Sequence, residues 1–579
     1  MNKTFYNLKE LVSVPLSDKY QEEGKWQGMY YESEGKAGIA LVAGECINPP
    51  AIELDLKAKG WHRIYIALGG LGGRSAVGVS ISGEDGKTVI APTNIEYYND
   101  VWNWGGYNFG EESFFKATDL TGKKLIFEKP ASLDVGGVSV VLYVRIEEMS
   151  NSEVAEYLKS GSEKRILYHF DQDYTSEMDY KTAEDYLGRM KMLEHGNGEI
   201  IDHECFLEMY SGTYNTDKTP WKNYGKSQQR LSKFIDRQVE LKRLFSETAH
   251  KMNMKIYGGY RIEMGDFTVP YNPSYANDGA WETYSDFRCM TRDAKPINVL
   301  SYAYPEVRKM MVDNILKTLP DEWDGVSLYF HRGLFVSFEK PVLDEVKKRF
   351  CVDARRLPRK DERLQEVQCG YITEFIRELT VALKEKADRT GHERYKINIV
   401  TLYGAAISKE FGCDVETLLK EKLIDSVSQG IMGHYETIDD CIAEDGLIDL
   451  NKYSAKKKCG YTIIRNFADD VDIIVDGAKE FLDTQKKYGG EFYAALGWEN
   501  RSYSYQCELS KKLYEIGVEK FISWNANHQA KFCARIQGIK TCGDKQRILD
   551  GSYKISQRTF RLTNINGSDI SEFDPNWRG

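Results

Sequence analysis

The eleven residues from Trp323 to Gly333 read WDGVSLYFHRG, and this stretch decides the fold of the chain. An Asp-Gly pair precedes a short apolar run, Val326 to Phe330, that ends at once on His331 and Arg332. A buried strand with a polar finish is typical of a parallel barrel of the (β/α)8 type. In that fold the C-terminal end of each strand faces the active site, so an imidazole and a guanidinium lie where chemistry takes place.

The composition indicates a globular protein with more than one domain. The chain has 579 residues, of which 41% are hydrophobic and 29% charged, so it is long enough to bury at least two cores. No apolar run is long enough to span a bilayer, and the first 20 residues lack the apolar region of a secretory signal. Eleven cysteines are scattered singly, which favours a reducing compartment. We therefore expect a cytoplasmic protein with no membrane partner.

Charge and aromatic content narrow the choice of partner. The formal net charge is −10, and the sequence contains no cluster of basic residues, which argues against binding to nucleic acid. Aromatic residues make up 12% of the chain, and rings that stack on sugar faces are one use for them. Most of these rings must nevertheless form the core. We expect a carbohydrate substrate and keep a homo-oligomer as an open alternative.

The first part of the chain, residues 1–148, is predicted to be all β. Short β-rich runs are separated by glycine-rich turns, and no long helical pattern occurs. This spacing predicts a β-sandwich that resembles the jelly-roll accessory domains of carbohydrate enzymes. The predicted strands are Ala37–Ala43, Arg63–Leu68, Ala76–Ile81, Lys124–Phe127 and Val138–Val144.

The second part, residues 149–579, is predicted to form the (β/α)8 barrel. A polar helical linker leads into strand-like runs that alternate with amphipathic helices, which is the pattern of a parallel barrel. The expected barrel strands are Arg165–Phe170, Cys205–Tyr210, Lys255–Ile262, Gly325–Phe330, Lys396–Tyr403, Ile424–Ile431, Glu491–Trp498 and Lys520–Ala526.

The residues at the ends of these strands converge on one bowl and form the candidate site. A glycosidase needs one carboxyl to protonate the leaving oxygen and a second group as nucleophile or base. The predicted catalytic residues are Glu499, Glu263, Asp173 and His331. The predicted substrate-binding residues are Asp171, Arg261, Arg332, His434, Trp498, Trp524, Asn527 and His528. Asp324 lies at the opposite end of its strand and is expected to be structural.

Motifs for other chemistries are missing from the sequence. We find no HxH, HExxH or DxDxDG spacing, no GxGxxG opening a βαβ unit and no GxSxG elbow. The sequence therefore predicts neither a metal nor a cofactor, and a serine nucleophile is not supported. Each candidate site residue also has a structural interpretation, such as an ion pair, a helix cap or a buried ring.

Three stretches resemble the family-10-like glycoside hydrolase barrels. They are LSYAYPEVRKMMVDNIL (Leu300 to Leu316) followed by the opening stretch, GCDVETLLKEKLID (Gly412 to Asp425) and GVEKFISWNANH (Gly517 to His528). The resemblance covers roughly residues 165–549 and implies hydrolysis of a glycosidic bond. Relatives often carry an Asp in the fourth strand where this chain has Tyr329, and a phenol does not act as a carboxylate at neutral pH.

Three explanations of that departure stay open: another strand end supplies the carboxyl, His331 serves as the base, or the barrel has lost hydrolysis. The leading hypothesis is an exo-acting glycoside hydrolase in which His331 and Arg332 assist barrel-top carboxylates. One alternative is a carbohydrate-binding barrel without activity. Another is a sugar lyase or epimerase in which His331 or Tyr329 abstracts a proton.

Overall fold

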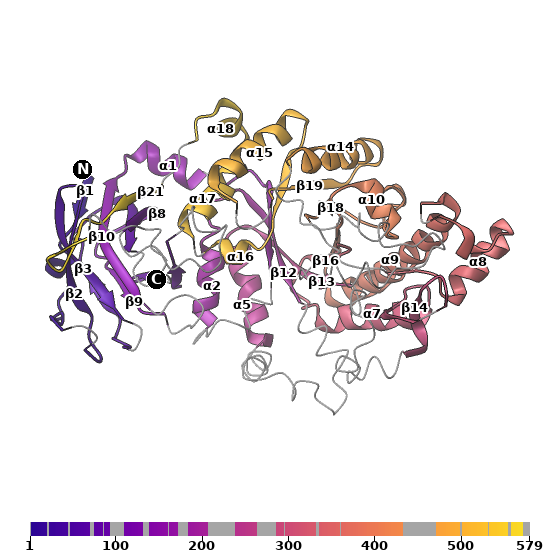
Figure 1. The fold of residues 1–579 in the computed structure, drawn as a ribbon, viewed down its shortest axis with the longest axis horizontal. Coiled ribbons are helices and arrows are strands. Elements are labelled where there is room, and N and C mark those ends of the chain that lie inside the picture. Colours follow the sequence, from indigo (N-terminus) through magenta and orange to yellow (C-terminus); the bar gives the residue numbers. More distant parts are fainter. Residues whose placement is uncertain are drawn as a thin grey trace.

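A computed structural model gives the fold of the protein, with an N-terminal β region (residues 1–148) on one side and a barrel on the other (Figure 1). The structure describes residues 2–19, 22–44, 47–69, 75–84, 86–92, 109–130, 138–159, 161–171, 183–205, 238–262, 285–294, 296–331, 335–358, 360–431, 471–497, 501–530, 532–553 and 557–570.

Eight parallel strands close into a barrel, as the sequence predicted. Each strand pairs with the next one along the chain, and the last, β20, returns to the first, β11, through Phe521 and Ile166. The strands are β11 (Ile166–Phe170), β12 (Gly198–Glu204), β13 (Lys255–Arg261), β16 (Gly325–Tyr329), β17 (Lys396–Val400), β18 (Ser426–Ser428), β19 (Glu491–Ala495) and β20 (Lys520–Ser523).

Seven of the eight predicted barrel strands overlap the observed ones, and the second prediction is wrong. The sequence favoured Cys205–Tyr210 because that run is apolar, whereas β12 (Gly198–Glu204) contains four charged or titratable side chains. All of β12 is nevertheless buried, and two of its carboxylates have basic partners: Glu204 contacts Arg261, and Glu199 accepts hydrogen bonds from Lys520 and from the Tyr493 hydroxyl. The apolar run that follows was therefore predicted as the strand in place of this polar one.

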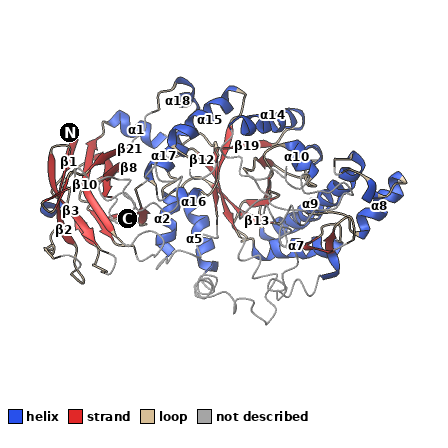
Figure 2. Ribbon diagram, in the orientation of Figure 1, coloured by secondary structure: helices blue, strands red, loops and turns tan. Residues whose placement is uncertain are grey.

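Helices connect the strands and cover the barrel (Figure 2). Several begin at a proline or at an Asp or Ser cap, which matches the usual N-terminal signals. The connecting helices are α2 (Ala183–Lys191), α5 (Gln238–Lys251), α7 (Pro305–Thr318), α8 (Lys340–Phe350), α9 (Glu362–Thr390), α10 (Ala405–Glu410), α11 (Val415–Lys420), α14 (Val471–Tyr488) and α15 (Tyr503–Glu515), followed after β20 by α16 (Ala526–Gln529), α17 (Cys533–Cys542) and α18 (Lys545–Asp550). Helix α1 (Asn151–Lys159) precedes the barrel.

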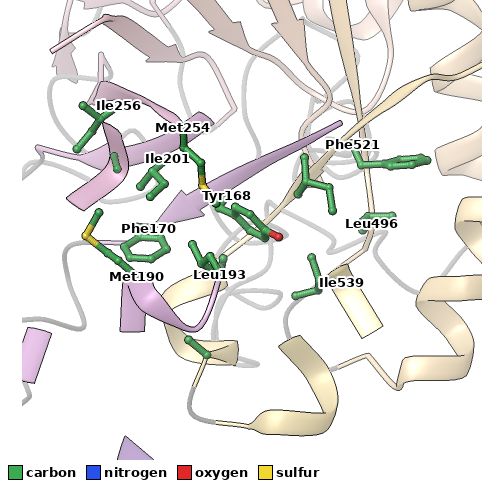
Figure 3. Close-up of a cluster of buried hydrophobic side chains, with 14 of the residues drawn as sticks. Tyr168, Phe170, Met190, Leu193, Ile201, Met254, Ile256, Leu496, Phe521 and Ile539 are labelled. Atoms are coloured by element: carbon green, nitrogen blue, oxygen red, sulfur yellow. The ribbon is translucent and has the colours of Figure 1, made fainter. Parts of the chain in front are cut away.

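Side chains alternate between the barrel interior and the helical layer. Tyr168 and Phe170 of β11 point outward and pack with Met190 and Leu193 of the helical layer (Figure 3). A separate buried cluster from the strands fills the interior, made of Leu167, Ile200, Tyr257, Tyr329, Val400, Ile431, Tyr493, Ala495, Ile522 and Trp524. The period of two along each strand therefore decides which side chains face the barrel axis.

The N-terminal β region consists of two antiparallel sheets. One contains β1 (Asn2–Phe5), β2 (Gln27–Ser33), β3 (Lys36–Ala43), β5 (Trp61–Gly69), β8 (Phe109–Asp119) and β10 (Ser139–Glu148), and the other contains β4 (Ile52–Leu54), β6 (Val77–Ile81), β7 (Thr88–Ile90) and β9 (Leu125–Glu128). All five strands predicted here correspond to observed ones.

The end of the chain returns to this first sheet. Strand β21 (Gln557–Arg561) pairs with β8, and β22 (Asn564–Ile565), which pairs with β23 (Ser568–Asp569), lies along β2. Residues within the range predicted for the barrel thus contribute strands to the N-terminal β region. A small hairpin, β14 (Arg288–Met290) with β15 (Pro296–Leu300), lies between β13 and α7. Within the described ranges, no helix has the length and apolar character needed to cross a membrane.

Gly259, in the middle of β13, makes room for two polar side chains of the barrel interior. A Cβ at this position would clash with the Tyr329 hydroxyl and would lie 2.8 Å from Asp202 Oδ1. We expect Gly259→Ala to destabilise the protein by about 1–3 kcal/mol, as overpacked cores do, and to lower the midpoint of urea denaturation.

Gly370→Ala is the matched control for this substitution. Gly370 lies within α9, where an added Cβ would meet nothing within 4 Å. Alanine should therefore stabilise this helix by up to about 1 kcal/mol. If Gly259→Ala and Gly370→Ala have the same midpoint of urea denaturation, a Cβ at Gly259 does not crowd the barrel interior.

Candidate functional site

Three neighbouring strands end in an ion-pair network at the C-terminal mouth of the barrel. The Arg261 guanidinium, at the end of β13, lies between two carboxylates: Nη2 is 3.2 Å from Glu204 Oε2 and 3.6 Å from Asp171 Oδ1, while Nε contacts Glu204 Oε1. The side chains are 6%, 1% and 12% exposed, respectively. Burial opposes ionisation of Asp171, but Arg261, His169, a hydrogen bond with Glu204 and His528 together outweigh it and lower the pKa of Asp171 to about 2.

His169 lies two residues before Asp171 on the same inward face of β11. The backbone N–H of Asn525 donates to its Nδ1 at 3.2 Å, so the ring proton is on Nε2, which lies 3.9 Å from Glu204 Oε2. Burial, with help from the Arg261 charge, lowers the pKa of His169 to about 4. His169 is therefore a neutral imidazole at physiological pH.

Four rings line the same part of the interior. The Trp524 ring centroid is 4.8 Å from that of His169, 5.3 Å from His331 and 6.4 Å from Tyr329. Tyr329 and His331 are two residues apart on one strand and so face the same side, with centroids 5.5 Å apart. His331 thus faces the interior. Burial raises the pKa of Tyr329 well above its usual value, which argues against this phenol as a base at neutral pH.

Asp202 of β12 is the deepest carboxyl of the site. Its side chain is fully buried, and neither oxygen has a hydrogen-bond partner of good geometry among the described residues. Burial raises the pKa of Asp202 to about 7, although the nearby hydroxyls of Ser327 and Tyr329 offset part of the effect. Asp202 and Asp171 are thus two carboxyls whose pKa values are driven far apart by their surroundings.

Residues after β20 complete the site. The Asn527 amide brackets the backbone of Asp171, accepting from its N–H at 3.1 Å and donating to its carbonyl at 2.8 Å. His528, on the same short helix, is buried and lies close enough to lower the pKa of both Asp171 and His169. Asn525 adopts a left-handed conformation, φ 48°, which turns the chain from β20 into α16.

The structure brings together six of the predicted site residues: Asp171, Arg261, His331, Trp524, Asn527 and His528. Their roles remain predictions. Asp173, Glu263, Arg332, His434, Trp498 and Glu499 lie outside the described residues.

Sequence reasoning missed His169, Asp202 and Glu204. The last two belong to the strand that was placed too late, and His169 was treated as part of an apolar strand. A signal was present in the run GEIIDHE, because Ile200, Asp202 and Glu204 alternate on one face with Ile201 and His203 on the other. Among the described residues, no group of three or more metal-binding side chains is arranged to hold an ion.

No protein-family model matches the chain, and no curated protein matches it. Solved structures similar to it include the PgaB (BpsB) glycoside hydrolase domain from Bordetella bronchiseptica, with TM-score 0.37, 12% identity and coverage of 64% of this chain and 98% of that one. The α-galactosidase TtGalA from Thermus thermophilus has TM-score 0.35 and 10% identity, covering 89% and 94%. A citrate lyase from Burkholderia xenovorans has TM-score 0.25 and 12% identity, covering 52% and 73%. Similarity at this level does not transfer a function.

The buried Asp202 carboxyl should make the stability of the protein depend on pH. The pKa of Asp202 is raised in the folded state. Its contribution to the free energy of unfolding is therefore fully present below about pH 4 and is lost as the pH rises through about 7. Asp202→Asn cannot ionise. We expect this variant to have a higher Tm than the wild type at pH 8, by the equivalent of up to about 4 kcal/mol.

The test is calorimetry of both proteins between pH 4 and 9. The difference in Tm should grow between pH 4 and pH 7 and stay constant above it. A difference that is independent of pH would show that Asp202 does not change protonation on unfolding in this range.

Proposed function

We propose that the barrel mouth binds a carbohydrate and hydrolyses a glycosidic bond. The observation that carries the proposal is a group of buried polar atoms that make no hydrogen bond of good geometry to the described residues, although Asp202 and Tyr329 interact with each other: both oxygens of Asp202, the Tyr329 hydroxyl and the Trp524 indole N–H. Buried polar groups in native proteins are nearly always satisfied, so such a group marks a place where a polar ligand supplies the missing bonds.

A sugar matches the chemistry of this group. Sugar rings present hydroxyls around an apolar face, and Trp524 and Tyr329 offer one polar atom each on an aromatic ring. The Arg261 network beside them supplies a charged rim. The site therefore combines ring faces, donors and acceptors in one place, as carbohydrate sites do.

Two carboxyls with separated pKa values suit acid catalysis of hydrolysis. Asp202, with a pKa of about 7, retains a proton to deliver to the leaving oxygen, while Asp171 stays ionised and stabilises positive charge on the sugar. We assign to His331, whose ring lies beside Trp524 and Tyr329, the role of positioning the substrate. Asp173, Glu263 and Glu499 remain further candidates for the second carboxyl. The exo-acting mode, the cytoplasmic location and the kinship with family-10-like hydrolases remain part of this proposal.

Substitution of the two carboxyls tests the assignment. On an aryl glycoside that the wild type cleaves, found in a broad panel with product NMR, Asp202→Asn and Asp171→Asn should each lower kcat/KM by about 10²- to 10⁴-fold. The matched control is Asp324→Asn at the opposite end of β16, where the carboxylate accepts from the Ile256 N–H at 2.8 Å and contacts His250 at 2.9 Å. It should retain activity within about threefold. If Asp202→Asn and Asp171→Asn both hydrolyse the glycoside at the wild-type rate, neither carboxyl has the catalytic role proposed here.

The pH profile provides an independent check. If Asp202 acts in its protonated form, kcat/KM of the wild type should fall tenfold per pH unit above about pH 7. Asp171, with a pKa of about 2, should remain ionised throughout the assay from pH 6 to 9. A rate that is flat from pH 6 to 9 would exclude Asp202 as the proton donor.

A binding function without turnover is the second candidate. It is favoured by the contacts that fix Asp171 in place. Its carboxylate lies 3.6 Å from the Arg261 guanidinium, and its backbone N–H and carbonyl are both hydrogen-bonded to the Asn527 amide. Saturable binding of oligosaccharides without any released product would identify this case. A lyase that uses Tyr329 as the base is disfavoured by the raised pKa of its phenol.

A further inference from the structure

Polar side chains from three neighbouring strands form a hydrogen-bonded chain inside the barrel, below its mouth. Ser327 and Asn398 precede Tyr329 and Val400 by two residues, and the latter two belong to the interior cluster, so all four face the barrel axis. Bulky branched side chains usually fill this space, and a polar chain here therefore needs a separate explanation. Its members, each at most 3% exposed, are Ser327 on β16, Asn398 on β17, and Ser426 and Ser428 on β18 (Figure 1).

The Asn398 amide sets the direction of these hydrogen bonds. Its Oδ1 accepts from the Ser426 hydroxyl at 2.9 Å and from the Ser428 hydroxyl at 3.1 Å. Two donors on the oxygen hold the amide so that its nitrogen faces the other way, and Nδ2 donates to Ser327 Oγ at 3.1 Å. Because the Ser327 oxygen accepts this bond, its own proton remains available for another acceptor.

The acceptor that this proton can reach is Asp202. Gly259 of β13 pairs with Ser327 of β16, and a Cβ at Gly259 would lie 2.8 Å from Asp202 Oδ1. The carboxyl therefore occupies the space beside Ser327 that a larger residue on β13 would fill. Although neither carboxyl oxygen has a hydrogen bond of good geometry, the hydroxyl is near enough to act: burial raises the pKa of Asp202, and Ser327 opposes that rise.

The titratable and charged groups around Asp202 come from four strands. The Tyr329 phenol on β16 interacts with the carboxyl directly. His169 on β11 has its ring 5.4 Å from that of Tyr329 and is neutral at physiological pH. Glu204 on β12 and Arg261 on β13 also act on the phenol, but they are paired with each other, so their charges largely cancel. Two hydroxyls thus act on Asp202 at close range, those of Tyr329 and Ser327.

We propose that Asn398 is a positioning residue that holds the Ser327 hydroxyl toward Asp202, and that this hydroxyl sets the pH at which the carboxyl releases its proton. Burial without such a donor would keep Asp202 protonated to higher pH, whereas a general acid must also give its proton up. The catalytic meaning of this device rests on the proposed hydrolysis. The protonation of Asp202 does not, and it can be measured without a substrate.

Infrared difference spectroscopy of the full-length protein between pH 4 and 10 measures this protonation. The C=O band of the protonated Asp202 carboxyl is the band that Asp202→Asn lacks, and its loss as the pH rises gives a midpoint. We expect Ser327→Ala to raise that midpoint by about 1–2 pH units, because the carboxylate loses one hydrogen-bond donor. An unchanged midpoint overturns the proposal.

Ser523→Ala is the matched control. Ser523 on β20 is 1% exposed and lies between Ile522 and Trp524, which belong to the interior cluster, so its side chain faces the helical layer. The same substitution at the same depth of burial should leave the midpoint of Asp202 at the wild-type value. An equal rise in Ser523→Ala would overturn the role of Ser327, since the loss of any buried serine would then have this effect.

A double-mutant cycle tests the part played by Asn398. Asn398→Leu keeps the approximate shape of the side chain without its donor, and we expect a rise of the midpoint that is smaller than in Ser327→Ala. If Asn398 acts through Ser327, its substitution in the Ser327→Ala background produces no further rise. Rises that add overturn the positioning role. Should Asn398→Leu not fold, Ser426→Ala with Ser428→Ala, which frees the Asn398 oxygen, takes its place in the cycle with the same expectation.

Kinetics separate this device from the proposed function. In Ser327→Ala the fall of kcat/KM at high pH should move upward by as many pH units as the infrared midpoint. A raised infrared midpoint in a protein whose wild type hydrolyses no glycoside supports the role of Ser327 and overturns the hydrolase assignment. An active wild type whose infrared midpoint is unchanged by Ser327→Ala has the opposite meaning.

Discussion

The position of the Arg261 guanidinium between Glu204 and Asp171 determines the rest of the barrel mouth. It joins the ends of β11, β12 and β13, three strands that are adjacent in the barrel. The attraction between the buried guanidinium and the two buried carboxylates offsets part of the free energy that each group loses when it leaves water. Removal of one partner leaves a buried charge without compensation. The network therefore fixes the ionised state of Asp171 and leaves a neutral His169 beside it.

Asp202 lies outside this network, and that separation gives it a different chemistry. It is on the same face of β12 as Glu204 but two residues deeper, where hydroxyls rather than a guanidinium surround it. A carboxyl in such a place destabilises the fold at neutral pH, and proteins commonly retain costs of this kind at functional sites. Gly259, which has no side chain, provides the space for Asp202 and Tyr329.

The sequence predicted the barrel because most of its strands are apolar runs bounded by turn residues, as in Gly325–Phe330. It misplaced the second strand because burial there depends on partners distant in the sequence: Glu199 meets Lys520, and Glu204 meets Arg261. Local hydrophobicity does not reveal such pairs. His331 and Trp524 could be placed at strand ends from the sequence, whereas the pKa values of Asp171 and Asp202 follow only from three-dimensional surroundings.

The turn before β12 connects the helical layer to the barrel mouth. The chain leaves α2 at Lys191, passes Glu194 and His195, and enters β12, which carries Asp202 and Glu204. Asn197 joins the turn to the barrel, because its carbonyl accepts from the N–H groups of Arg165 and Ile166 at the start of β11. These hydrogen bonds fix the position of β12 against β11. They therefore also fix the position of Asp202, which lies on β12, relative to the residues around it. The turn between α2 and β12 contains two residues in the left-handed conformation, His195 and Asn197. It links the helix that precedes β12 to the strand that carries the carboxyls of the barrel mouth.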